Sequence, residues 1–173
     1  GFNPTNLEQA SCYHALGHLL MYITDADIPK SLSLCREFSE KPTHNYSHIC
    51  YDAVFMQIYQ PLEPDDFSLI EGKEVSKKQV KAFCGGYKGE EQGSCWSESW
   101  PLSKEEILKP NGAETFCSYL SSPVEAKRCF VAVVYVMTAQ FGFDFDKINN
   151  FCKSMRGSNQ AKCFSQVASR FIE

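Results

Sequence analysis

The stretch that decides the fold is CYHALGHLLMYITDADIPKSLSLC, residues 12–35, because the chain repeats its plan further on. Residues 129–152, CFVAVVYVMTAQFGFDFDKINNFC, align with it without a gap. Both stretches begin with a cysteine and an aromatic residue, continue with apolar residues, reach an acidic turn (Asp27 and Asp144) and end at a cysteine. The pattern predicts two helices joined by a turn in each stretch.

Further cysteine–aromatic pairs occur at Cys50, Cys95 and Cys163, so such starts recur every 34 to 45 residues. A period in this range is typical of a solenoid of helical hairpins. We therefore expect an all-α fold, a right-handed stack of antiparallel hairpins that forms a single domain over residues 1–173. In each hairpin one cysteine is expected to begin the first helix and another to end the second. The approximate repeats are 12–49, 50–94, 95–128, 129–162 and a partial 163–173.

Composition limits the function classes. The chain has 173 residues, of which 43% are hydrophobic, and a formal net charge of −4. It can bury a core, and its acidic balance argues against a nucleic-acid binder, which would show a basic face. No apolar run reaches the roughly 18 residues that a transmembrane helix needs. Because the sequence starts at Gly1 without Met, we expect it to be a piece of a longer protein.

The nine cysteines alternate between long and short separations. In a stack of hairpins the end of one second helix lies beside the start of the next hairpin, so the short separations predict disulfides. Each would close a loop of roughly 11–16 residues and stabilise the fold by about 3 kcal/mol through loop entropy. The predicted pairs are Cys35–Cys50, Cys84–Cys95, Cys117–Cys129 and Cys152–Cys163.

Two other interpretations of the cysteines are kept: a different connectivity, and nine reduced cysteines that act as small hydrophobes in a cytosolic protein. A structural zinc site is disfavoured, since the chain has no C-x2-C pair. Cys12 has no partner in the scheme. Either its partner lies on a helix that precedes this sequence, or it is a free reactive thiol. Disulfides would place the protein outside the cytoplasm, as a secreted, periplasmic or cell-surface protein.

His14 and His18 are the candidate metal ligands. Their spacing of four places both imidazoles on one face of the predicted helix, the arrangement of helical metal sites. Asp52 occupies the place of His14 in the second repeat and could stand beside the pair, and Met21 could join the same face. Two histidines and a carboxylate suit iron or zinc, and a methionine favours copper. The competing interpretation is a chance pair, because the glutamate of H-E-x-x-H is absent at Ala15.

No residue is assigned a catalytic role. The sequence has no P-loop, no G-x-S-x-G and no G-x-G-x-x-G, and no oxyanion motif surrounds any cysteine.

The small and apolar pairs Ala15/Leu16, Ala53/Val54 and Ala132/Val133 stand at similar places in the first helices. With the period, they resemble tetratricopeptide-type repeats, although the Trp, Leu-Gly and Tyr consensus is missing. The segment Cys12–His18 also resembles uncharacterised secreted bacterial proteins rich in Cys and Gly-His. The resemblance implies an extracytoplasmic helical scaffold that binds through a concave surface.

Three functions follow as hypotheses. The first is a non-enzymatic extracytoplasmic scaffold that binds a protein partner or assembles with copies of itself. The second is a metal-binding protein or metalloenzyme centred on His14 and His18, with copper, zinc or iron. The third is a small-molecule pocket lined by Tyr13, Tyr22, Phe55, Tyr59 and Tyr135.

Overall fold

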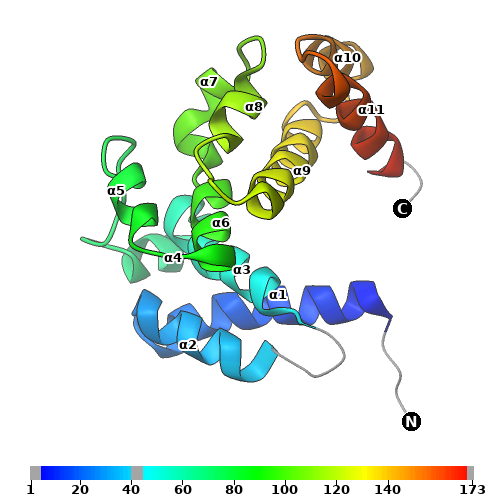
Figure 1. Ribbon diagram of the computed structural model, residues 1–173. Coiled ribbons are helices and arrows are strands. Elements are labelled where there is room, and N and C mark those ends of the chain that lie inside the picture. Colours follow the sequence, from blue (N-terminus) through cyan, green and yellow to red (C-terminus); the bar gives the residue numbers. More distant parts are fainter. Residues whose placement is uncertain (1–4, 40–44, 171–173) are drawn as a thin grey trace. The chain divides into compact units, whose positions relative to one another are not determined.

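The computed structural model describes residues 5–39 and 45–170, and in these ranges the chain is helical with no extended strand. The contacts within the chain divide it into two compact units, Gly1–Pro101 and Leu102–Glu173. The first unit contains α1 (Asn6–Ile23), α2 (Ile28–Ser39), α3 (Ser47–Tyr59), α4 (Pro64–Leu69), α5 (Val80–Gly85) and α6 (Gly89–Glu98) (Figure 1). A 3-10 turn, Trp100–Ser103, precedes the helices of the second unit: α7 (Lys104–Ile107), α8 (Gly112–Cys117), α9 (Pro123–Gln140), α10 (Phe145–Lys153) and α11 (Ser158–Arg170). The predicted all-α class is confirmed, and the single repeat domain stays a prediction.

The two aligned stretches have the same N-cap and the same connecting turn, but α1 packs against α2, whereas α10 packs on α11 and has at most slight contact with α9. Helices α1 and α9 each have 18 residues and begin after a hydroxyl N-cap, Thr5 or Ser122, that accepts a backbone N–H three residues on. Each helix ends in a turn with two consecutive left-handed residues at equivalent places. These are Asp25 and Ala26 after α1, and Gly142 and Phe143 after α9.

The acidic residues of the two turns also make equivalent hydrogen bonds. Asp27 Oδ1 accepts the Lys30 N–H at 3.0 Å, and Asp144 Oδ1 accepts the Lys147 N–H at 3.1 Å. Each carboxylate therefore caps the second helix of its hairpin, α2 or α10. The local repeat inferred from the gapless alignment is present in the backbone.

Four disulfides join the pairs that the short separations predict: Cys35–Cys50, Cys84–Cys95, Cys117–Cys129 and Cys152–Cys163. Each links one helix to the next helix along the chain, and Cys35 lies four residues before the end of α2 rather than at it. The expectation that a cysteine begins each first helix is wrong. Cys12 and Cys129, for example, lie six residues after Asn6 and Pro123, because the helices start at capping residues further upstream.

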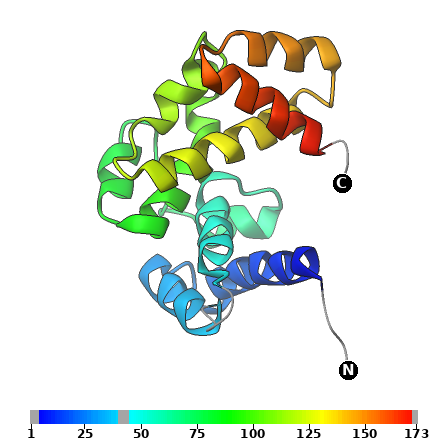
Figure 2. The same ribbon diagram turned by 45° about the vertical axis from the view of Figure 1, so that its right-hand side comes forward.

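In the first unit α1 packs against both α2 and α3, and α1 and α2 lie side by side in both views (Figures 1 and 2). Helix α1 approaches α3 tightly at Gly17, where a Cβ would lie 2.3 Å from the Cys50 carbonyl oxygen. Only glycine fits there, so the crossing of the two helices is specified by one residue.

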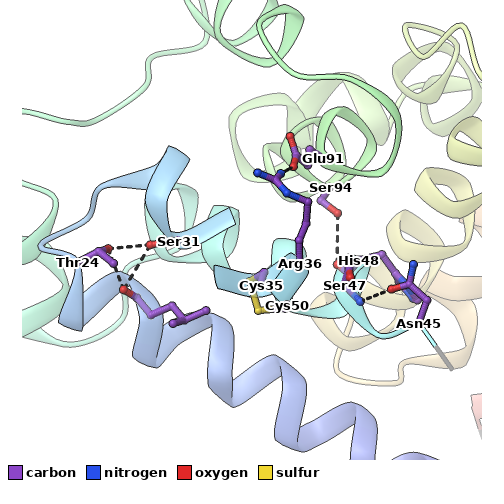
Figure 3. Close-up of a disulfide and its surroundings, with 11 residues drawn as sticks. Thr24, Ser31, Cys35, Arg36, Asn45, Ser47, His48, Cys50, Glu91 and Ser94 are labelled. Carbon is purple, nitrogen blue, oxygen red and sulfur yellow. Dashed lines mark hydrogen bonds and ion pairs between the residues drawn. A yellow bond between two sulfur atoms is a disulfide. The ribbon is translucent and has the colours of Figure 1, made fainter. Parts of the chain in front are cut away.

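The joint between α2 and α3 also holds α6 in place. Figure 3 shows the Cys35–Cys50 disulfide with the Arg36 side chain reaching from α2 to the Glu91 carboxylate of α6. From the same helix α6, the Ser94 hydroxyl donates to the His48 carbonyl oxygen of α3 at 3.4 Å. Helices α2, α3 and α6 are therefore linked to one another near this disulfide.

In the second unit α9 is the central helix, in contact with α8 and with α11, while α10 packs on α11. Phe130, Val133 and Met137 of α9 are buried in its core. Among the described residues of the whole chain, no helix combines the length and apolar character needed to cross a membrane.

Candidate functional site

His14 and His18 lie on one face of α1, as their spacing predicts. Both are half-buried, and their ring centres are 5.0 Å apart with the ring planes at 67°. Burial, and then the charge of His18, lower the pKa of His14, so that its imidazole favours the neutral form. The structure therefore brings the predicted histidine pair together at a partly solvent-accessible place.

A chain of hydrogen bonds runs from His18 to α4. His18 Nδ1 lies 2.7 Å from Gln57 Oε1 of α3, and Gln57 Nε2 donates to Asp66 Oδ1 at 2.6 Å. The Asp66 carboxylate can only accept, so the amide nitrogen of Gln57 faces it and the amide oxygen faces His18. His18 Nδ1 must then be the donor, and in the neutral ring the lone pair is on Nε2.

Asp66 is the anchor of this chain. Tyr22 OH donates to its Oδ1 at 2.5 Å, and the backbone N–H groups of Leu62 and Glu63 donate to its Oδ2, each at 3.0 Å. Burial opposes ionisation, but these hydrogen bonds and that of Gln57 outweigh it and lower the pKa of Asp66 well below its usual range.

The pKa of Tyr22 shifts in the opposite direction. The hydrogen bond to Asp66, followed by burial, raises the pKa of Tyr22 to about 12. Tyr22 stands four residues after His18 on α1, so helical spacing could have suggested it as a neighbour. Gln57 and Asp66 could not be found in this way, because they meet α1 only through the packing of α3 and α4.

The other two predicted metal ligands are Met21, which stays a prediction, and Asp52. Met21 is fully buried in the core. Asp52 is half-buried on α3 and interacts with the carboxylate of Glu98 on α6. Within residues 5–39 and 45–170, no three His, Cys, Asp or Glu side chains are grouped as a three-ligand metal centre requires. His14 and His18 are therefore not joined by Asp52.

Asp52 and Glu98 form an acidic pair of their own. Burial, and then the Asp52 carboxylate, raise the pKa of Glu98 well above its usual range, while a 2.7 Å hydrogen bond from Gln60 Nε2 opposes the shift. Glu98 consequently favours the protonated form much more than an exposed glutamate does.

The aromatic residues named for a small-molecule pocket are mostly used in packing. Phe55 and Tyr59 are buried in the first unit, where both rings contact Phe83 edge to face. Tyr13 stacks on Tyr46 with ring centres 4.7 Å apart.

The outer face of α1 is a second candidate site. Cys12 forms no disulfide and is exposed, although all nine cysteines fall within the described residues. Leu19 and Ile23 follow it on the same side of the helix, with 55% and 64% of their surface exposed. We call Cys12, Leu19 and Ile23 the outer α1 face.

No protein-family model matches the chain, and neither a curated protein nor a solved structure gives a significant match.

Proposed function

We propose that this chain is an extracytoplasmic helical-repeat scaffold that self-associates, with two copies joined across the outer α1 face and by a disulfide between their Cys12 thiols. The observation that carries the proposal is the difference between Cys12 and Cys129. They hold the same place in two helices with the same N-cap and the same following turn, yet Cys129 is fully buried and bonded to Cys117 of α8, whereas Cys12 is exposed.

The remaining joints follow the pattern of Cys129. Cys50, Cys95 and Cys163 are each bonded to the preceding helix, and each is fully buried. Among the described residues, Cys12 is thus the one cysteine of this class without a covering helix. The buried state of the corresponding cysteines supports contact as the role of the outer α1 face.

The chemistry of the outer α1 face suits a second copy. Glu8 is the only Asp, Glu, Lys or Arg residue in α1, so two such helices can meet without strong like-charge repulsion. Leu19 and Ile23 would lose water-exposed surface, at about 25 cal/mol for each Å² of apolar area.

The cysteines favour the same occupant. Eight of the nine are consumed in disulfides within the chain, so a second copy offers one free thiol, its own Cys12. Two Cys12 thiols form one S–S bond and release two protons and two electrons. A disulfide oxidant such as oxidised glutathione accepts these and is reduced to two thiols.

Two further observations support a repeat scaffold outside the cytoplasm. Successive first helices contact one another within each unit, α1 with α3 and α3 with α6, and α9 with α11. Contacts between neighbouring hairpins are the basis of a solenoid. Four disulfides are typical of proteins from oxidising compartments.

The oligomeric state after incubation with oxidised glutathione tests this function. Light scattering coupled to size exclusion should give twice the chain mass. Leu19→Glu should shift the chain to the monomer, and Cys12→Ser should leave a weaker dimer that dissociates on dilution. Leu62→Glu is the matched control, because Leu62 is 74% exposed and lies outside the outer α1 face. A monomeric unmodified chain, or a dimer insensitive to Leu19→Glu, would overturn the proposal.

A further inference from the structure

The separation of the His14 and His18 rings suits two ligands of one metal ion. An ion bound in the plane of an imidazole at about 2.1 Å from the nitrogen lies about 3.2 Å from the ring centre. Two rings at a roughly tetrahedral angle around that ion have centres about 5 Å apart. The observed separation is 5.0 Å.

The hydrogen bond to Gln57 prepares His18 for this role. Metal-bound histidines almost always donate their second ring N–H to a neighbouring oxygen, which fixes the tautomer and the ring orientation. Here Nδ1 donates to Gln57 Oε1 at 2.7 Å, and Gln57 is itself held by Asp66 at 2.6 Å. The lone pair of His18 Nε2 is left for a ligand.

The repeat argues against a purely structural role for the two imidazoles. Val131 and Tyr135 occupy the equivalent places in the hairpin of α9. A helix with the same N-cap and the same following turn therefore forms without histidine at either position. Both imidazoles are half-buried, so solvent can reach the ion and supply its remaining ligands.

We propose that His14 and His18 form a two-imidazole site for a borderline divalent transition-metal ion, with water completing the coordination and with Gln57 as a positioning residue. The Irving–Williams order makes copper(II) bind more tightly than zinc. Asp52 and Met21 have no part in this site, which does not depend on self-association through Cys12.

A copper(II) titration of the full chain carrying Cys12→Ser tests the site, because that substitution removes the one thiol that would compete for copper. Calorimetry should show one ion per chain, and electron paramagnetic resonance should show coupling to two imidazole nitrogens. His14→Ala and His18→Ala should each lower the affinity by more than about 10-fold. His48→Ala, which changes a half-buried histidine of α3, is the matched control.

Gln57→Leu separates positioning from ligation. It keeps both imidazoles but removes the acceptor for His18 Nδ1, and the loss of such a partner typically lowers metal affinity by about 10–100-fold. Circular dichroism monitors the fold in every variant. The proposal is overturned if no copper binds, if binding survives the double His14→Ala/His18→Ala variant, or if the spectrum shows fewer than two imidazole nitrogens in the intact site.

Discussion

Gly17 of α1 lies directly against Cys50 of α3, so closely that a Cβ on Gly17 would stand 2.3 Å from the Cys50 carbonyl oxygen and 2.6 Å from the Ala53 Cβ. Neither neighbour is the end of a flexible side chain. The backbone of α3, fixed by the Cys35–Cys50 disulfide, cannot move aside without disturbing α2 as well.

Gly17→Ala should therefore destabilise the first unit even though alanine is the better helix former by about 1 kcal/mol. Forced overpacking typically costs 1–3 kcal/mol, and we expect a net loss near the middle of that range, at about 2 kcal/mol. Denaturant unfolding followed by circular dichroism measures it. Ala15→Ser, at an exposed position of the same helix, should change stability little. A Gly17→Ala protein as stable as the parent would mean that α1 and α3 do not cross at Gly17.

Glu98→Gln should stabilise the protein at neutral pH. Because the folded-state pKa of Glu98 lies above the unfolded one, its contribution is fully present below the unfolded pKa and is lost as pH rises through the folded pKa. Glutamine can still accept from Gln60 but carries no charge beside Asp52. We expect the variant's melting temperature to exceed the parent's by a few degrees, about the effect of 1 kcal/mol, at pH 7 and by less near pH 4.

The control for this comparison is Glu71→Gln, at an exposed position of the same unit, which should leave the melting temperature almost unchanged at both pH values. If Glu98→Gln lowered stability at pH 7, the carboxylate of Glu98 would have to be ionised and favourably paired, contrary to its position beside Asp52.

Asp66→Asn should release the phenol of Tyr22. The hydrogen bond to the carboxylate is the main reason that the pKa of Tyr22 reaches about 12, so without it that pKa should fall toward the ordinary value near 10. A tyrosine titration by nuclear magnetic resonance reads this directly. Asp65→Asn changes a neighbouring exposed carboxylate with no hydrogen bond to Tyr22 and should shift the titration only slightly. An unchanged pKa of Tyr22 in Asp66→Asn would contradict the hydrogen-bond chain from Tyr22 to His18.

Removal of the Cys152–Cys163 disulfide by a double serine substitution should destabilise the second unit by about 3 kcal/mol. The bond closes a loop of 11 residues between α10 and α11. Closing this loop lowers the entropy of the unfolded chain and so stabilises the folded unit. Ser165→Ala is the control, since this exposed residue of the same unit closes no loop. Equal unfolding free energies for the parent and the double variant would show that the Cys152–Cys163 disulfide does not stabilise the second unit.

Much of the local structure could be predicted from the cysteine spacing and the gapless alignment of residues 12–35 and 129–152. They indicated the two helices of each stretch, the acidic turns at Asp27 and Asp144, and the four disulfide pairs. Helix boundaries were less accessible, because capping at Thr5 and Ser122 starts the helices well before the cysteines.

The middle of the chain departs most from the regular plan. The Ser76 hydroxyl and N–H bond to Gln79, a capping pattern that is typical of a helix start. The helix α5 begins later, at Val80, and a further short helix, α4, precedes it with Pro64 in its first turn. That extra helix carries Asp66, so the part of the site hardest to predict comes from the segment that breaks the repeat.

The histidine pair could be predicted from its spacing, but its surroundings could not. Asp52 was placed near the pair by analogy between repeats, whereas α3 presents Gln57 to His18 and directs Asp52 toward Glu98. Which residues of α3 meet α1 depends on the crossing at Gly17, a tertiary feature that no local pattern encodes.

The state of Cys12 tests the central claim most directly. The full chain would be oxidised with glutathione disulfide, digested without reduction and mapped by mass spectrometry. Self-association across the outer α1 face predicts a species in which two Cys12 peptides are joined to each other, together with the four intrachain pairs. A chain whose Cys12 stays a free thiol under these conditions, or is found bonded to one of the other eight cysteines, would contradict it.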